Sequence, residues 1–176
     1  MKIYVLLDFS DYSHTQLKLA NQWCLKFGYD MVLVHETILM IPSLGSPDVR
    51  LKIEYGQKNE VLNQLEKLRQ SYIDSSVKVS FEITAEPLIK HLSERIQIEK
   101  KDLILMGIKG TGKLKQIFLG STATRVIEEL NQITLTIPIN LDLNFPQKLI
   151  VAVHHKTPIN EEALSILVGI IKNGLL

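Results

Sequence analysis

A glycine-rich segment at residues 106–122 has the residue types and spacing that suit contact with phosphate. Its glycines and hydroxyl residues follow the pattern Gly-x2-Gly-x9-Gly-Ser-Thr, at Gly107, Gly110, Gly120, Ser121 and Thr122. Glycines allow a backbone to approach an anion closely, and the N–H groups at the start of a helix favour negative charge. If a helix begins at Ser121, the spacing predicts a backbone cradle for phosphate with two hydroxyls beside it. The alternative, that these glycines only permit turns, stays open.

Two better-known phosphate motifs fit this segment less well. Residues 107–113 match the start of a P-loop, but Leu114 stands where the Mg²⁺-binding Ser or Thr belongs. The dinucleotide-binding fingerprint needs a third glycine where this chain has Lys115. We therefore reject both motifs.

The charge around the segment supports an anionic ligand. The whole chain has a formal net charge of only +1. No acidic residue occurs between Asp102 and Glu128, however, and four basic residues do: Lys109, Lys113, Lys115 and Arg125. The sequence predicts a local positive field in a chain of nearly balanced charge.

Asp8 is the second candidate, because it directly follows an apolar run at residues 3–7. Ligands of open α/β sheets bind in the crevice outside the carboxyl ends of the strands. A carboxylate at the end of the first strand would face the glycine-rich segment if the first and fourth strands are neighbours. A role in a turn or a helix cap is the alternative for Asp8.

The elements that must position these residues alternate between strands and helices. Strands are predicted at 3–7, 31–35, 77–83, 103–106 and 133–139, with helices between them. Ser13 is predicted to cap the first helix, Gly28 to end it, and Pro87 to begin the third. Alternating strands and helices predict an α/β fold with an open parallel sheet covered by helices on both faces.

The C-terminal residues suggest a partial repeat. Residues 148–154 are similar to residues 2–8, and a helical stretch follows at 161–172. We interpret 1–142 as one domain and 147–176 as the first strand and helix of a second copy. An ordinary additional strand and helix on the same sheet is the alternative.

Composition disfavours several classes of function. Cys24 is the only cysteine, so it cannot form an internal disulfide, and its helical position beside Trp23 predicts a buried thiol. We expect a cytoplasmic protein, because no secretory signal and no apolar stretch of about 20 residues are evident. Aromatic residues are only 6% of the chain and no basic stripe accompanies them, so nucleic acid is not expected as a partner. His154 and His155 would point to opposite faces of a strand, so no metal site is predicted.

The sequence resembles the universal stress protein family over roughly residues 2–140. The resemblance is carried by Asp8-Phe-Ser10 after the first strand, Val34-His35 in the second, Ala85-Glu-Pro87 before the third helix, and the glycine spacing. It implies a five-stranded parallel sheet of order 3-2-1-4-5, of the adenine nucleotide α-hydrolase-like type, and dimers formed through the last strand.

The resemblance also implies a site for ATP or another adenine nucleotide, with or without Mg²⁺. It places Asp8 near the base and ribose, with Leu6 and Leu7 as backbone contacts beside it. The expected ribose-phosphate loop comprises Met106, Gly107, Lys109, Gly110, Gly120, Ser121 and Thr122.

Three positions depart from the family pattern. Glu36, after the second-strand histidine, replaces an apolar residue expected against adenine, so base packing or base preference could differ. The fifth strand lacks the usual proline at its start, which affects the expected dimer geometry. In the second copy His154 replaces the aspartate and no glycine loop follows, so that copy is not expected to bind nucleotide.

These observations favour a stress-response regulatory module that binds an adenine nucleotide and signals through loop ordering and dimer or partner contacts. Slow ATP hydrolysis is one alternative, although no general base or Walker-type magnesium ligand is evident. A protein-interaction module with an empty crevice is the other.

Overall fold

The computed structural model describes residues 1–38, 46–96, 102–108, 120–130, 132–141 and 160–174. The chain divides into two units, Met1–Leu141 and Asp142–Leu176. The first unit contains the sheet, Asp8 and the glycine-rich segment at residues 106–122. The predicted repeat strand at 148–154, including His154 and His155, lies outside the described residues.

Five parallel strands form the sheet of the first unit. They are β1 (Lys2–Leu6), β2 (Asp30–Glu36), β3 (Val79–Thr84), β4 (Leu103–Gly107) and β5 (Thr134–Ile137), in the spatial order β3-β2-β1-β4-β5. The predicted α/β fold and strand order are confirmed. The fifth strand is shorter than predicted: it ends at Ile137, and Pro138, which follows, has no N–H to continue a ladder.

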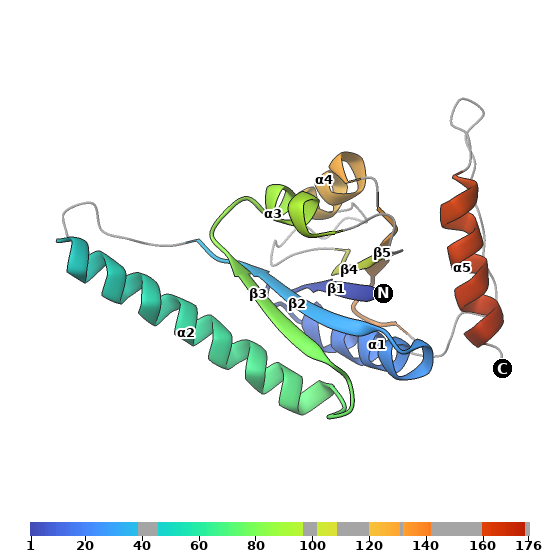
Figure 1. Cartoon of the computed structure of the whole chain (residues 1–176), viewed down its shortest axis with the longest axis horizontal. Coiled ribbons are helices and arrows are strands. Elements are labelled where there is room, and N and C mark those ends of the chain that lie inside the picture. The colour runs from blue at the N-terminus through green and yellow to red at the C-terminus, as the bar shows by residue number, and fades with distance from the viewer. Residues whose placement is uncertain (39–45, 97–101, 109–119, 131, 142–159, 175–176) are drawn as a thin grey trace. The chain divides into compact units, whose positions relative to one another are not determined.

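Helices cover both faces of this sheet. Helices α1 (Tyr12–Phe27) and α2 (Pro47–Tyr72) lie on one side, and α3 (Leu88–Arg95) and α4 (Ser121–Glu129) lie on the other (Figure 1). The central strands β1 and β4 are almost wholly buried because they are covered on both faces, which explains their continuous apolar sequence. From β1 the chain adds β2 and β3 on one side of the sheet, and it then returns to add β4 and β5 on the other side of β1. The direction of winding therefore reverses between β1 and β4.

The ends of α1 agree only partly with the prediction. Gly28 ends the helix in the left-handed conformation, with φ of 69°, and its N–H donates to Cys24 O at 2.9 Å. The predicted cap at Ser13 is wrong, because the helix begins at Tyr12 and Asp11 precedes it. The Ser13 N–H donates to Ser10 O at 3.0 Å, so the turn after β1 leads directly into the helix and buries the Ser13 side chain.

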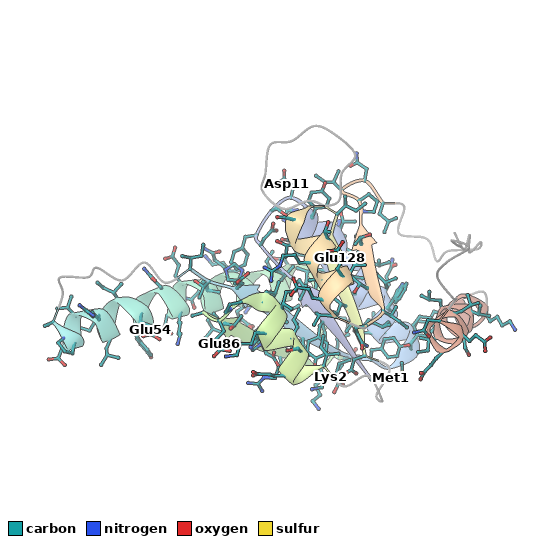
Figure 2. All side chains as sticks on the ribbon, turned by 90° about the horizontal axis from the view of Figure 1, so that it is seen from above. Met1, Lys2, Asp11, Glu54, Glu86 and Glu128 are labelled. Carbon is teal, nitrogen blue, oxygen red and sulfur yellow. The ribbon has the colours of Figure 1, made fainter. Side chains whose placement is uncertain are left out.

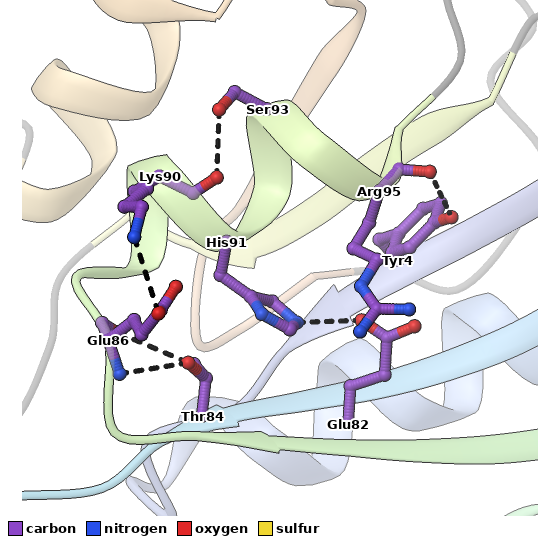
Figure 3. A network of polar contacts seen from close by, with 8 residues as sticks. All are labelled: Tyr4, Glu82, Thr84, Glu86, Lys90, His91, Ser93 and Arg95. Atoms are coloured by element: carbon purple, nitrogen blue, oxygen red, sulfur yellow. Dashed lines mark hydrogen bonds and ion pairs between the residues drawn. The ribbon is translucent and has the colours of Figure 1, made fainter.

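Polar contacts hold α3 against the sheet. His91 has its Nε2 2.8 Å from Glu82 Oε2 on β3, and the Tyr4 hydroxyl donates to Arg95 O at 3.2 Å (Figure 3). Burial, together with the nearby Asp102 carboxylate, raises the pKa of Tyr4 to about 12. The hydroxyl of Tyr4 therefore stays protonated and remains a donor to the end of α3.

In the second unit the structure describes one helix, α5 (Glu161–Gly174). Two glutamates lie in its first turn and Lys172 in its last, an arrangement that complements the helix dipole. Among the helices that the structure describes, none combines the length and the apolar character needed to cross a bilayer.

Candidate functional site

The candidate site lies at the carboxyl ends of β1 and β4, where the chain reverses its winding. Leu6 pairs with Met106 in the sheet and with Val34 on the other side. The side chains of Leu6 and Met106 are buried, so neither side chain is available to a ligand. Such a reversal point is where open α/β sheets bind their ligands.

The loop after β1 is fixed by contacts to the end of β2. The Leu7 N–H donates to Val34 O at 2.9 Å, and His35 Nδ1 donates to Leu7 O at 2.8 Å. Phe9 has a φ of 57°, a left-handed conformation that is uncommon for a bulky residue, and its ring lies 4.3 Å from that of His35. The backbone around Asp8 is therefore held in one conformation. His35 therefore has a structural role, because its Nδ1 is paired with Leu7 O.

Asp8 has features of both predicted roles. One oxygen, Oδ1, accepts a hydrogen bond from the Ser10 N–H at 3.1 Å and so closes a local turn. The side chain nevertheless stays exposed at the carboxyl edge of β1. A carboxylate fixed by a turn and open to solvent can accept hydrogen bonds from ligand hydroxyls at little cost in side-chain entropy.

Gln16 joins the two strand ends, and sequence reasoning did not identify it. It lies on α1 with only 2% of its surface exposed. With its amide oriented to satisfy both neighbours, the nitrogen donates to Leu6 O at 3.2 Å and the oxygen accepts from the Gly107 N–H. This side chain thus pairs polar backbone groups that β1 and β4 would otherwise leave buried and unpaired where they diverge. The sequence did contain a signal for Gln16. This polar residue lies one helical turn before Ala20 and two turns before Trp23, on the apolar face of the predicted helix.

Gly107 is required because of close packing against α1. A Cβ at this position would lie 3.0 Å from both Cβ and Cγ of Tyr12, closer than real Cβ atoms normally approach. Since the Tyr12 Cβ is fixed to the helix backbone, it cannot move aside cheaply. The first glycine of the motif therefore lets β4 approach the start of α1, a reason that the spacing alone did not reveal.

The two ends of the glycine-rich loop are tied together. The Ile108 N–H donates to Ile137 O at 3.1 Å, and the Gly120 N–H donates to Ile108 O at 2.8 Å. The start of α4 is thereby held beside the end of β4. Residues 109–119 between these anchors, including the candidates Lys109 and Gly110, lie outside the described residues.

Helix α4 begins in a way that suits an anion. Gly120 precedes the helix with φ of −62° and ψ of 153°, and as a glycine it supplies no side-chain cap to the first N–H groups. Ser121 and Thr122 are exposed in the first turn, which contains no acidic residue. Partial positive charge and two hydroxyls are therefore presented together, as predicted.

Glu36 performs a structural task that the sequence did not suggest. Its Oε1 accepts a hydrogen bond from the N–H of Leu88, the first residue of α3, at 3.2 Å. The carboxylate thus caps the positive end of that helix. On α4, the pKa of Arg125 is raised mainly by its hydrogen bond and ion pair with Glu129, and Glu36 adds to the same shift. Because Arg125 Nε pairs with Glu129 Oε1 at 2.7 Å, it contributes less to the predicted positive field than its sequence position implied.

The fold and this site can be compared with known proteins. The model of the Universal stress protein family matches residues 1–138. Universal stress protein MJ0531 of Methanocaldococcus jannaschii is 27% identical over 131 residues, which cover 72% of this chain and 75% of that protein.

Two solved structures share the fold at lower identity. Protein MJ0577, the subject of a structure-based assignment of biochemical function, aligns with a TM-score of 0.59 and 23% identity over 78% of this chain and 94% of that one. A universal stress protein in complex with cAMP aligns with a TM-score of 0.56 and 14% identity over 80% of this chain and 98% of that one. From the family match over residues 1–138 and the sheet order, the chain belongs to the universal stress protein family.

Proposed function

We propose that this chain is a stress-response regulatory module that binds ATP or a related adenine nucleotide at the carboxyl ends of β1 and β4. The phosphates would lie at the start of α4, near Gly120, Ser121 and Thr122. The ribose and base would extend toward the exposed carboxylate of Asp8. Ligand binding would order the loop between Ile108 and Gly120 and so alter a surface that a partner can read.

The observation that carries the proposal is the hydrogen bond from Gly120 N–H to Ile108 O. It brings the uncapped start of α4 to the end of β4, beside the strand that leads to Asp8. A carboxylate acceptor and an anion-favouring helix start then flank one crevice. A universal stress protein with the same fold is known in complex with cAMP, which supports the proposal of an adenine nucleotide as the ligand.

The test is the thermal unfolding of the full chain with and without MgATP, repeated with AMP and cAMP. A ligand at 100 times its Kd should stabilise the folded state by about 2.7 kcal/mol, which raises the Tm by several degrees. Gly120→Val should abolish this shift, because the valine side chain would occupy the position of the phosphate. The backbone at Gly120 is in the extended region that valine also adopts, so the substitution itself should not strain the backbone.

The matched control is Gly56→Val. Gly56 lies on α2, and a Cβ there would meet no atom within 4 Å. This variant should keep the shift of the unmodified chain. An equal shift in Gly120→Val and Gly56→Val would show that nucleotide does not bind at the start of α4.

Hydrolysis is a separate question that the same protein can answer. A turnover assay with and without Mg²⁺ would detect slow ATPase activity. Turnover that is lost in Asp8→Ala would favour an enzyme, whereas binding without turnover would favour the regulatory module.

A further inference from the structure

Helix α2 has two halves with different surroundings. Its C-terminal half packs on the first unit: Leu65 is fully buried, and Tyr72 stacks on His14 of α1 with ring centroids 4.9 Å apart. Just beyond it, the Asp74 N–H donates to Asn21 Oδ1 at 2.9 Å. The N-terminal half, around Glu54, extends past the sheet (Figures 1 and 2).

An exposed stripe of apolar residues begins in the projecting half and continues into the C-terminal half. Leu51 is 63% exposed, Tyr55 70% and Leu62 40%. Together with Lys58 they follow the spacing 4-3-4, which places side chains on one face of a helix and is the repeat of a coiled-coil seam. We refer to Leu51, Tyr55, Lys58 and Leu62 as the α2 stripe.

The exposure of the α2 stripe is unfavourable for an isolated molecule. Each large apolar side chain left in water forgoes the hydrophobic stabilisation that full burial would supply. Most helical stability in proteins comes from packing of an apolar face, and the first half of α2 has little of it. A partner that covered the stripe would stabilise both the helix and the complex.

We propose that the α2 stripe is an interface between two copies of this chain, whose α2 helices pack antiparallel. The stripe reads almost the same in both directions, since leucines stand at its two ends and Tyr55 and Lys58 in its middle. A two-fold axis between Tyr55 and Lys58 sets Leu51 against Leu62 of the second copy. The same axis sets Tyr55 of each copy against Lys58 of the other copy.

The middle of this pairing is chemically complementary. Lys58 Nζ is already bound to Glu54 Oε1 at 2.8 Å, which leaves its methylene groups along the stripe. A tyrosine ring can cover those methylenes and approach the ammonium. This cation–π contact becomes stronger when water is excluded from it. The two-fold symmetry therefore supplies a partner for the Tyr55 ring and for the Lys58 side chain of each copy.

The charges of α2 permit self-association. The helix has four acidic and five basic residues, and the two signs are interspersed along its length. A copy of the same helix therefore meets no large field of like charge. A partner with a strongly acidic or basic surface would gain no comparable advantage, which favours a second copy as the occupant.

This interface differs from the one implied by resemblance, which uses the last strand. Strand β5 is an edge of the sheet and could also pair with a copy of itself. The two possibilities predict different effects of the same substitutions, and neither depends on nucleotide binding.

Sedimentation velocity of the full chain at about 1–100 μM measures the association. The unmodified chain should dimerise, and Leu51→Glu combined with Leu62→Glu should weaken the dimer by at least about tenfold, because like charges would face each other at both ends of the stripe. The control is Val49→Glu, since Val49 is 46% exposed but lies away from the stripe on the helix. It should leave the dimer intact.

Cysteine cross-linking tests the antiparallel register. Leu51→Cys and Leu62→Cys, mixed as two single variants, should form a disulfide-linked dimer on mild oxidation. Each variant alone should cross-link far less, because identical positions would lie about 16 Å apart along the helices. Cys24 is only 3% exposed and should not interfere. A monomer at 100 μM, or a dimer that survives the double glutamate variant, would overturn the proposal.

Discussion

The carboxyl ends of β1 and β4 and the first half of α2 belong to the same unit but are built in opposite ways. At the strand ends, Gln16 pairs the buried backbone groups and Gly107 leaves no room for a Cβ beside Tyr12. Along the first half of α2, the apolar side chains of Leu51 and Tyr55 stand in solvent. The first region is suited to hold backbone groups in place for a small ligand. The second is suited to meet another protein surface through its side chains.

Gly107→Val should break the first region most severely. The added Cβ and methyl groups would overlap Tyr12, so we expect a loss of about 1–3 kcal/mol in unfolding free energy, measured by urea denaturation. Gly56→Val on α2, where a Cβ meets nothing, should change that free energy far less. Equal effects of the two substitutions would remove the packing distinction between the regions.

Gln16→Met should have the next largest effect, because it keeps the length of the side chain but removes both hydrogen bonds. The Gly107 N–H and the Leu6 carbonyl would lose their partner, which costs about 1–3 kcal/mol for a buried polar group. Since these groups adjoin the proposed ligand site, nucleotide affinity should fall as well, as measured by calorimetric titration. Unchanged stability and affinity would mean that Gln16 does not hold the strand ends together.

Glu36→Ala should have a smaller effect on stability. Loss of the acceptor for the Leu88 N–H should lower the unfolding free energy by about 0.5–2 kcal/mol, the usual range for a helix N-cap. Thermal unfolding would measure this loss. Glu86→Ala is a suitable comparison, because Glu86 lies just before the start of α3. If the two variants were equally stable, the carboxylate of Glu36 would be free for another role at the site.

The sheet could be predicted from the sequence because its strands are buried on both faces and therefore appear as continuous apolar runs. Asp8 and Gly120 could be placed at the end of β1 and at the start of α4 from local spacing alone, whereas the packing of Gly107 against Tyr12 could not be predicted. Gln16 and Glu36 could not, because each acts on an element distant in the sequence: Gln16 on β1 and β4, and Glu36 on α3.

Helix α2 shows the same limit in a different form. The helical spacing of Val61, Leu65, Leu68 and Tyr72 marks only its second half, where Leu65 is fully buried. The helix begins at Pro47, a favoured residue for a first helical position. In the first half, Val49, Leu51 and Tyr55 are exposed, so periodicity toward a core could not identify it.

The most direct test of nucleotide binding is the identity of the small molecules that stay with the purified protein. The full chain would be desalted, denatured and analysed by mass spectrometry beside Gly120→Val prepared in the same way. The account predicts ATP, ADP, AMP or a related adenine nucleotide in the unmodified protein and a strong reduction in the variant. An empty unmodified protein that also shows no thermal shift with millimolar MgATP, AMP or cAMP would contradict it and would leave the α2 stripe as the principal candidate for function.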